Sequence, residues 1–443
     1  MFVRTCRAMA GLSTGRRCRA TPHCGSAGDN RAVPRVVRTA GLVLTEHEFS
    51  VPLDHASPDG ERITVFAREV ADPDGRERPF LVFLQGGPGF EAPRPTRHPT
   101  APYWMDRALE EFRVLMLDQR GTGRSTPVGA LAGKTPQEQA DYLKLFRADS
   151  IVRDAEWIRR ELGVDRWSIL GQSFGGFCAL TYLSIAPEGL REALFTGGLP
   201  PIGRPVDDVY GVTYETVLER TRRYYERYPG DRERVLELRR RLDAEEVLLP
   251  GGDRLTGRRF RQIGHMLGMG PGAEHLHYIL ELPPDSPAFL HDIEAAGQFP
   301  RNPIYAAIHE ACYADGGTTG WSAERVLPDA YAEDPALFTG EHVYPWMFED
   351  YSALRPLHEA AEILAGHEWP RLYDPGVLRA NEVPAAAAVY AQDMYVERSF
   401  SEETAGRVGG LRAWVTNEYE HDGLRVAGDR ILGRLIDLAR GRA

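Results

Sequence analysis

The sequence predicts an α/β fold with a mostly parallel central sheet and a helical segment inserted between two parts of that sheet. Short apolar runs such as "FLVFLQ" (80–85) and "FRVLMLDQRG" (112–121) are typical of central strands covered on both faces. These runs alternate with segments of helical spacing, the pattern of parallel α/β sheets. Between 205 and 370 helical, Arg- and Glu-rich stretches replace the alternation, which resumes after 371. We therefore expect a core built from 41–204 and 371–443, with a helical cap at 205–370.

The individual elements follow from local periodicity. "HEFSVPLDH" (47–55) and "RITVFAREV" (62–70) alternate apolar and polar residues, as an antiparallel pair at a sheet edge does. In 151–162 the apolar positions fall at helical spacing. Next come a strand at 167–170, a sharp turn, a long apolar helix, and another strand near 192–196. Late strands are expected at 385–390 and 411–416.

Composition excludes several classes of function. The chain has 443 residues and a net charge of −11, which argues against nucleic acid as a partner, and no uncharged run is long enough to cross a membrane. Residues 1–40 are Arg-rich and lack the apolar stretch of a secretory signal, so we expect a disordered extension, with a transit peptide as the alternative. Three of the five cysteines lie in this stretch, and the remaining Cys178 and Cys312 offer no disulfide framework, which favours a cytoplasmic location. Nothing indicates the oligomeric state.

The segment "GQSFGG" (171–176) predicts a nucleophilic serine. It lies between a strand and an apolar helix, so a tight turn would lift the hydroxyl of Ser173 clear of the sheet. Gly171 and Gly175 are small because larger side chains would collide across such a turn. The start of the following helix would favour negative charge.

A serine nucleophile needs a base and an acid that orients the base. Asp393 follows the late strand at 385–390, and His421 follows the strand at 411–416, so both stand where a nucleophile elbow of this kind expects them. Asp422 competes for the role of the acid. Other histidines compete for the role of the base, and we expect all of them to be solvated surface residues of the cap: His309, His342, His358 and His367.

The run "QGGPGF" (85–90) predicts an oxyanion loop. Acyl transfer needs two backbone N–H groups aimed at the forming oxyanion. One would come from Phe174, the residue after the nucleophile, and the other from Gly87, on a glycine-rich loop that can approach closely. We also expect a cis peptide bond between Gly87 and Pro88.

Three motifs and a terminal block resemble the prolyl aminopeptidases (proline iminopeptidases), which are α/β-hydrolases of the S33 serine peptidase family. The motifs are "QGGPGF" (85–90), "DQRGTGRST" (118–126) and "GQSFGG" (171–176), and "DMYV…TNEYEHDGLR" (393–425) is similar to the end of the larger members. The likeness covers roughly residues 45–425. It departs at Gln85, where many members have histidine. Asp118, Arg120 and Arg124 are interpreted as supports of the site that tie loops together.

The resemblance implies glutamates in the cap that hold the free amino or imino group of a peptide. "NPIYAAIHEACY" (302–313) places one such acid at Glu310, and "GEHVYPWMFED" (340–350) offers a second at Glu341. Surface acids on helices are the alternative reading of both. Aromatic residues nearby could line a slot for a pyrrolidine ring: Tyr305, Tyr344, Trp346 and Phe348.

The sequence thus predicts a serine aminopeptidase that releases N-terminal proline, without metal or other cofactor, from short peptides. The alternative on the same scaffold is an esterase, an amidase or an aminopeptidase of broader specificity. The alternative from another class is a non-catalytic binding protein with a hydrolase fold. The presence of Ser, Asp and His in the expected order along the chain argues against it.

Overall fold

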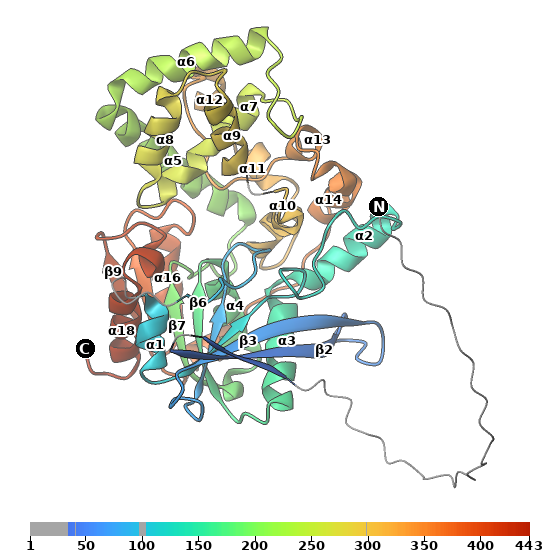
Figure 1. The fold of residues 1–443 in the computed structure, drawn as a ribbon, viewed down its shortest axis with the longest axis vertical. Coiled ribbons are helices and arrows are strands. Elements are labelled where there is room, and N and C mark those ends of the chain that lie inside the picture. Colours follow the sequence, from blue (N-terminus) through green and yellow to red (C-terminus); the bar gives the residue numbers. More distant parts are fainter. Residues whose placement is uncertain (1–33, 40, 97–102, 298) are drawn as a thin grey trace, which may run out of the picture. The chain divides into compact units, whose positions relative to one another are not determined.

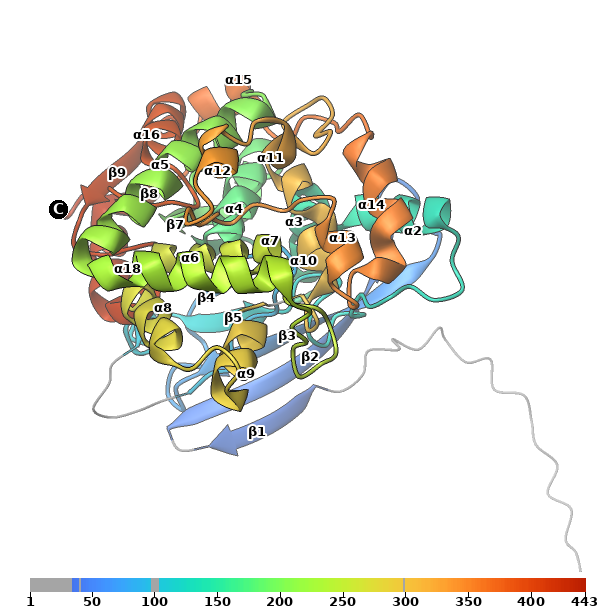
Figure 2. The same cartoon turned by 90° about the horizontal axis from the view of Figure 1, so that it is seen from above.

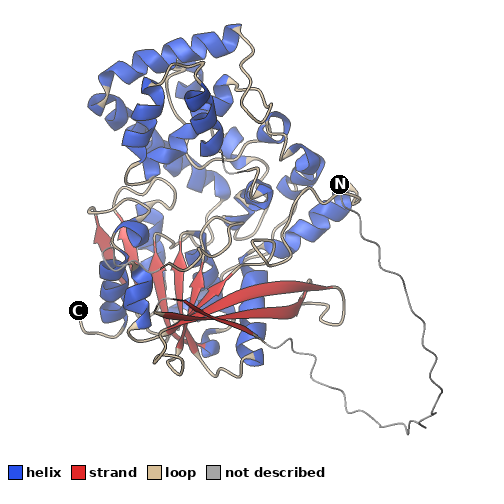
Figure 3. Cartoon of the chain, in the orientation of Figure 1, coloured by secondary structure: helices blue, strands red, loops and turns tan. Residues whose placement is uncertain are grey.

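A nine-stranded sheet runs through the described part of the chain (Figures 1 and 3). The structure is a computed structural model that describes residues 34–39, 41–96, 103–297 and 299–443. The strands are β1 (Arg35–Thr39), β2 (Leu42–Pro52), β3 (Arg62–Ala71), β4 (Phe80–Leu84), β5 (Arg113–Leu117), β6 (Trp167–Gln172), β7 (Leu190–Thr196), β8 (Ala385–Tyr390) and β9 (Leu411–Thr416). Their order is β1-β2-β3-β5-β4-β6-β7-β8-β9. The strands β1, β2, β3 and β5 pair antiparallel, and all pairs from β5 to β9 are parallel.

Successive side chains of the central strands point to opposite faces of the sheet and pack into two separate apolar cores. In β4, Phe80, Val82 and Leu84 face one core, whereas Leu81 and Phe83 face the other. All five side chains are buried, because helices cover both faces of the sheet. This explains why the strand is a continuous apolar run in the sequence.

Four helices of the core provide most of this cover. Helices α3 (Ala148–Glu161) and α4 (Phe174–Ile185) pack together on one face, and α4 contacts β4, β6 and β7. Helices α1 (Trp104–Leu109) and α18 (Gly428–Ala439) pack together on the other, where α18 contacts β7, β8 and β9. The predicted helix at 151–162 is thus α3, shifted by a few residues.

Most of the chain between β7 and β8 is helical and carries no strand of the sheet. It holds α5 (Val206–Arg227), α6 (Pro229–Ala244), α7 (Gly257–Arg261), α8 (Gly272–Glu281), α9 (Pro287–Ala296), α10 (Pro303–Ile308), α11 (Ser322–Arg325), α12 (Ala330–Glu333), α13 (Met347–Asp350), α14 (His358–Ala365) and α15 (Pro375–Arg379). Figures 1 and 2 show α5 to α12 gathered beyond one end of the sheet. We use the name cap for 205–370, and these boundaries remain a proposal.

The remaining helices connect the core. They are α2 (Pro136–Leu143), α16 (Arg398–Arg407) and α17 (Gly423–Val426), with short 3₁₀ turns at Lys144–Phe146 and Pro187–Gly189. The cap has further 3₁₀ turns at Gln262–Gly268, Glu310–Cys312 and Arg355–Leu357. In the ranges that the structure describes, no helix combines the length and the apolar character needed to cross a bilayer.

The first forty residues need a correction. Residues 35–39 were expected to belong to a disordered extension, but they form β1, which pairs antiparallel with β2 and extends the sheet edge. Most side chains of this strand are exposed, so its sequence "RVVRT" lacks the apolar alternation by which a strand is recognised. The rest of the predicted extension, residues 1–33, lies outside the described residues.

The loop after β5 is anchored by buried charge. The guanidinium of Arg120 donates to Asp154 on α3 and to the carbonyl oxygens of Pro52, Leu53 and Leu145. Asp118 accepts from the guanidinium of Arg94. These contacts tie the start of the chain to the loops around the sheet, as the sequence led us to expect of Arg120 and Asp118.

Candidate active site

Ser173 stands at the turn between β6 and α4. Its backbone has φ 55° and ψ −126°, a left-handed conformation that is rare for a residue with a side chain. The side chain nevertheless lines a cavity, as a nucleophile elbow requires.

The elbow tolerates no side chain at its glycines. A Cβ at Gly175 would lie 1.9 Å from the carbonyl oxygen of Leu84, and one at Gly171 would lie 2.3 Å from that of Gly175. Both neighbours are backbone atoms, which cannot move aside without displacing β4 or α4. The glycines therefore fix how closely the serine turn packs against the central strands.

Asp393 and His421 form a buried pair at the ends of β8 and β9. The Nδ1 atom of His421 lies 2.7 Å from Oδ2 of Asp393. The other carboxylate oxygen, Oδ1, accepts hydrogen bonds from the backbone N–H groups of Tyr395 (2.9 Å) and Val396 (3.0 Å). With the carboxylate held in this way, the opposite nitrogen of the imidazole, Nε2, is free to serve as a base.

The surroundings of His421 favour proton uptake. Burial by itself would lower the pKa of the imidazole, but the adjacent Asp393 carboxylate, by charge and hydrogen bond, and the charge of Glu341 outweigh it and raise the pKa. The carboxylate of Asp422, the competing acid, forms no hydrogen bond or ion pair with the described imidazole of His421, and its Oδ1 accepts from the backbone N–H of Gly270 at 3.0 Å. The geometry thus favours Asp393 over Asp422.

The glycine-rich loop after β4 lies directly against Ser173. A Cβ at Gly86 would be 2.9 Å from the Cβ of Ser173, so this loop approaches closely only because it lacks side chains. Gly87 has φ +128°, and the Gly87–Pro88 bond is cis, as expected from the sequence. Phe174 is the first residue of α4, so its N–H has no helical acceptor. Both predicted oxyanion donors thus belong to segments that meet at Ser173.

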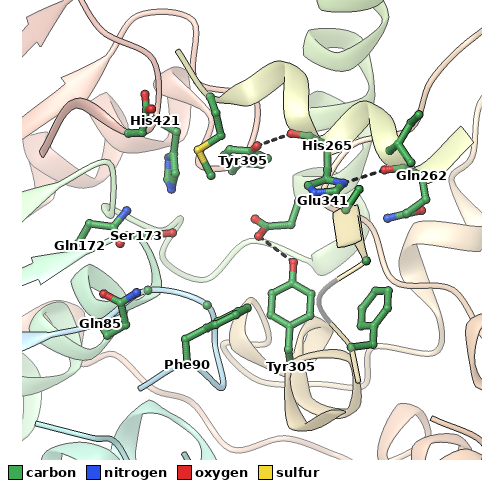
Figure 4. A pocket seen from close by; sticks show the side chains of 18 of the residues that line it. Gln85, Phe90, Gln172, Ser173, Gln262, His265, Tyr305, Glu341, Tyr395 and His421 are labelled. Atoms are coloured by element: carbon green, nitrogen blue, oxygen red, sulfur yellow. Dashed lines mark hydrogen bonds between the residues drawn. The ribbon is translucent and has the colours of Figure 1, made fainter. Parts of the chain in front are cut away.

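The cavity at Ser173 lies between these loops and the cap. Its empty space, counted out to the open mouth and including the solvent there, is about 1120 Å³. Figure 4 shows Ser173, His421 and Glu341 facing the same space. Its walls mix polar and charged residues with apolar and aromatic ones, and the latter include Phe90, Ile263, Met269, Ile293, Phe299, Tyr305, Tyr351 and Tyr395.

Glu341 is the acid of the cap that reaches this cavity. Its Oε1 accepts a hydrogen bond of 2.7 Å from the Tyr305 hydroxyl. Burial raises the pKa of the carboxyl group to about 7, even though the Tyr305 hydrogen bond and the nearby His421 work in the opposite direction. Such a carboxylate gains most when a cationic ligand arrives beside it.

The structure does not bring Glu310 into the same cavity. Glu310 borders a separate, small cavity with Thr319 and Trp321, and its Oε1 accepts from the backbone N–H of Ala323 at 2.9 Å. Burial raises its pKa to about 7. In this arrangement the carboxylate holds the start of α11, and its contact with a substrate amine stays a prediction.

Two of the competing histidines are not the solvated residues that the sequence suggested. His309 and His342 are buried, and burial lowers their pKa values to about 4 and about 3. They pack inside the cap, where His309 Nε2 lies 3.1 Å from the carbonyl oxygen of Glu341. None of the four histidines lines the catalytic cavity, and of the predicted aromatic residues only Tyr305 does.

Several lining residues have no signal in the sequence. Tyr395 follows Asp393 by two positions and stacks edge-on against His421, with ring centroids 4.8 Å apart. Its hydroxyl donates to the carbonyl oxygen of His265 in the cap, so it links the acid loop to the cap. In the sequence, only the closeness of Tyr395 to Asp393 could have indicated that it lies in the active site.

Comparison with known proteins agrees with this geometry. Residues 79–328 match the family model described as "alpha/beta hydrolase fold". A proline iminopeptidase from Aeromonas sobria is 50% identical over 420 residues, which cover 90% of this chain and 97% of that protein. The proline iminopeptidase aneH from Aspergillus aculeatus is 35% identical and covers 90% of this chain and 94% of its own length.

The fold, the elbow and the family match define an α/β-hydrolase. Within that class the chain belongs to the proline iminopeptidase family, because the similarity to the Aeromonas and Aspergillus proteins extends over nearly their full length. The fold class and the family predicted from the sequence are both confirmed.

Proposed function

We propose that the protein is a serine aminopeptidase that removes N-terminal proline from short peptides. The observation that carries the proposal is the placement of one half-buried carboxylate, Glu341, in the same cavity as Ser173 and His421. Family membership supports the choice of proline, and the apolar and aromatic residues in the wall suit a pyrrolidine ring.

The proposed chemistry follows the usual order of acyl transfer. His421 accepts the proton of Ser173 as the hydroxyl attacks the carbonyl carbon, while Asp393 orients the imidazole and stabilises its charged form. The N–H groups of Gly87 and Phe174 stabilise the oxyanion. His421 then gives its proton to the departing peptide nitrogen, and water releases proline from the acyl-enzyme by the same route.

Recognition of the free N-terminus is assigned to Glu341. The imino cation of the substrate would pair with its carboxylate, and Tyr305 would hold that carboxylate in position through the 2.7 Å hydrogen bond. An N-blocked peptide lacks the cation and leaves the carboxylate without a partner, which is costly for a charge that burial disfavours. The site therefore selects exopeptidase substrates.

The test compares the naphthylamides of proline, alanine and N-acetylproline, with Ser173→Ala as the catalytic control. We expect fast release only from the free proline substrate, and none above background in the variant. Equal rates on the blocked substrate or on simple esters would instead favour a general esterase or amidase on this scaffold. Full activity of Ser173→Ala would refute the assigned nucleophile.

A further inference from the structure

One cation of the catalytic cavity has no counter-ion among the described residues. Arg425 lines the cavity from α17, is exposed, and makes no side-chain hydrogen bond or ion pair with any described residue. The other arginine of the lining, Arg259, is different. It is 5% exposed, lies 3.3 Å from Asp253 and stacks on the ring of Tyr351.

The position of Arg425 along the chain places it near His421, on the leaving-group side of the scissile bond. It follows His421 by four residues, and α17 begins two residues after that histidine. Because His421 protonates the leaving nitrogen, the part of a peptide that follows the scissile bond must pass beside His421. The Arg425 charge is felt there, since it opposes the rise in the pKa of His421.

A short peptide carries a negative charge at its far end. With its N-terminal cation at Glu341, a peptide of a few residues would present its free carboxylate on the leaving-group side of the cavity. A guanidinium binds a carboxylate through two parallel hydrogen bonds, and the substrate would then have one charge matched at each end.

We propose that Arg425 forms a subsite for the C-terminal carboxylate of short peptide substrates. The inference rests on the proposed aminopeptidase function and extends it, since it defines the substrate class by both termini. Peptides with a free carboxylate within reach of Arg425 are favoured over their amides and over longer chains.

The experiment measures kcat/KM for Pro-Gly, Pro-Gly-Gly and Pro-Gly-Gly-Gly, each as the free acid and as the C-terminal amide. The wild-type protein should favour the acid about tenfold at the length that reaches Arg425, with a smaller preference at high salt. In Arg425→Ala the acid-to-amide ratio should fall to about one. Because the ratio compares the acid and the amide on the same variant, a loss of activity that affects both substrates equally leaves it unchanged.

Arg430→Ala is the matched control. Arg430 is exposed on α18, pairs with Glu418 at 2.7 Å and does not line the cavity, so its loss should leave the ratio unchanged. A ratio near one in the wild type, or a preference that persists in Arg425→Ala, would overturn the carboxylate subsite. Failure of the wild type to cleave any prolyl peptide or naphthylamide would instead refute the proposed function.

Discussion

Replacing Glu341 by glutamine tests how the site recognises a cation. Burial raises the pKa of this carboxyl group from 4.5 to about 7, a shift of about 2.5 units. At 1.36 kcal/mol per unit, the empty cavity disfavours the carboxylate by about 3 kcal/mol, which a bound imino cation can offset. Glutamine keeps the size and the acceptor for Tyr305 but lacks the charge. We expect kcat/KM for proline naphthylamide to fall about 100-fold.

A neutral analogue of the substrate separates the effect of the substrate's charge from the effect of its ring shape. Cyclopentanecarbonyl naphthylamide has the ring of proline without its nitrogen, so the wild type should prefer proline over this analogue by about 100-fold. In Glu341→Gln the preference should nearly vanish. Glu349→Gln, at an exposed position outside the cavity, is the control and should retain it. An unchanged preference in Glu341→Gln would refute the role of this carboxylate.

The same variant should change the pH profile. In the free enzyme Glu341 must be ionised, which occurs above its pKa of about 7, and His421 must be neutral, so kcat/KM should rise as pH increases through about 7. Without the Glu341 charge, which helps to raise the pKa of His421, the acid limb should move to lower pH. An acid limb that stays in place, or moves to higher pH, would contradict this electrostatic account.

Five further substitutions address the triad, the elbow and the scaffold. Asp393→Asn should lower kcat by about 10³- to 10⁴-fold because it loses the orienting carboxylate, whereas Asp422→Asn should cost less than tenfold; the reverse order in single-turnover assays would exchange their roles. Gly175→Ala should abolish activity, since its Cβ would lie 1.9 Å from a carbonyl oxygen, whereas Gly129→Ala, with open space around it, should match the wild type. Arg120→Met should lower the free energy of unfolding by about 3–5 kcal/mol, because it leaves a buried carboxylate without its guanidinium; a shift below 1 kcal/mol in urea denaturation would refute this.

The core of the fold could be predicted because its signals are local. Each central strand is a short apolar run, and the glycines around Ser173 mark a turn that no other residue type could form. Asp393 and His421 were identifiable because loops after parallel strands meet at one edge of the sheet. The strand at 35–39 was missed because an exposed edge strand has little apolar alternation.

The cap is where sequence reasoning lost accuracy. Glu310 lies in a 3₁₀ turn and Glu341 in an irregular segment before α13, both in aromatic-rich stretches, and only the packing of these segments decides which carboxylate faces Ser173. The burial of His309 and His342 has the same origin, since both residues are covered by the tertiary packing of the cap. Tertiary contacts of the cap, more than any local motif, thus determine the substrate end of the site.

Labelling with a fluorophosphonate probe tests the central claim most directly, since such probes react with serines activated by a neighbouring base. The account predicts that intact mass rises by one probe adduct, that peptide mapping places it on Ser173, and that Ser173→Ala and a His421→Ala variant remain unlabelled. Labelling of another serine, or equal labelling of the His421→Ala variant, would contradict a nucleophile at Ser173 activated by His421.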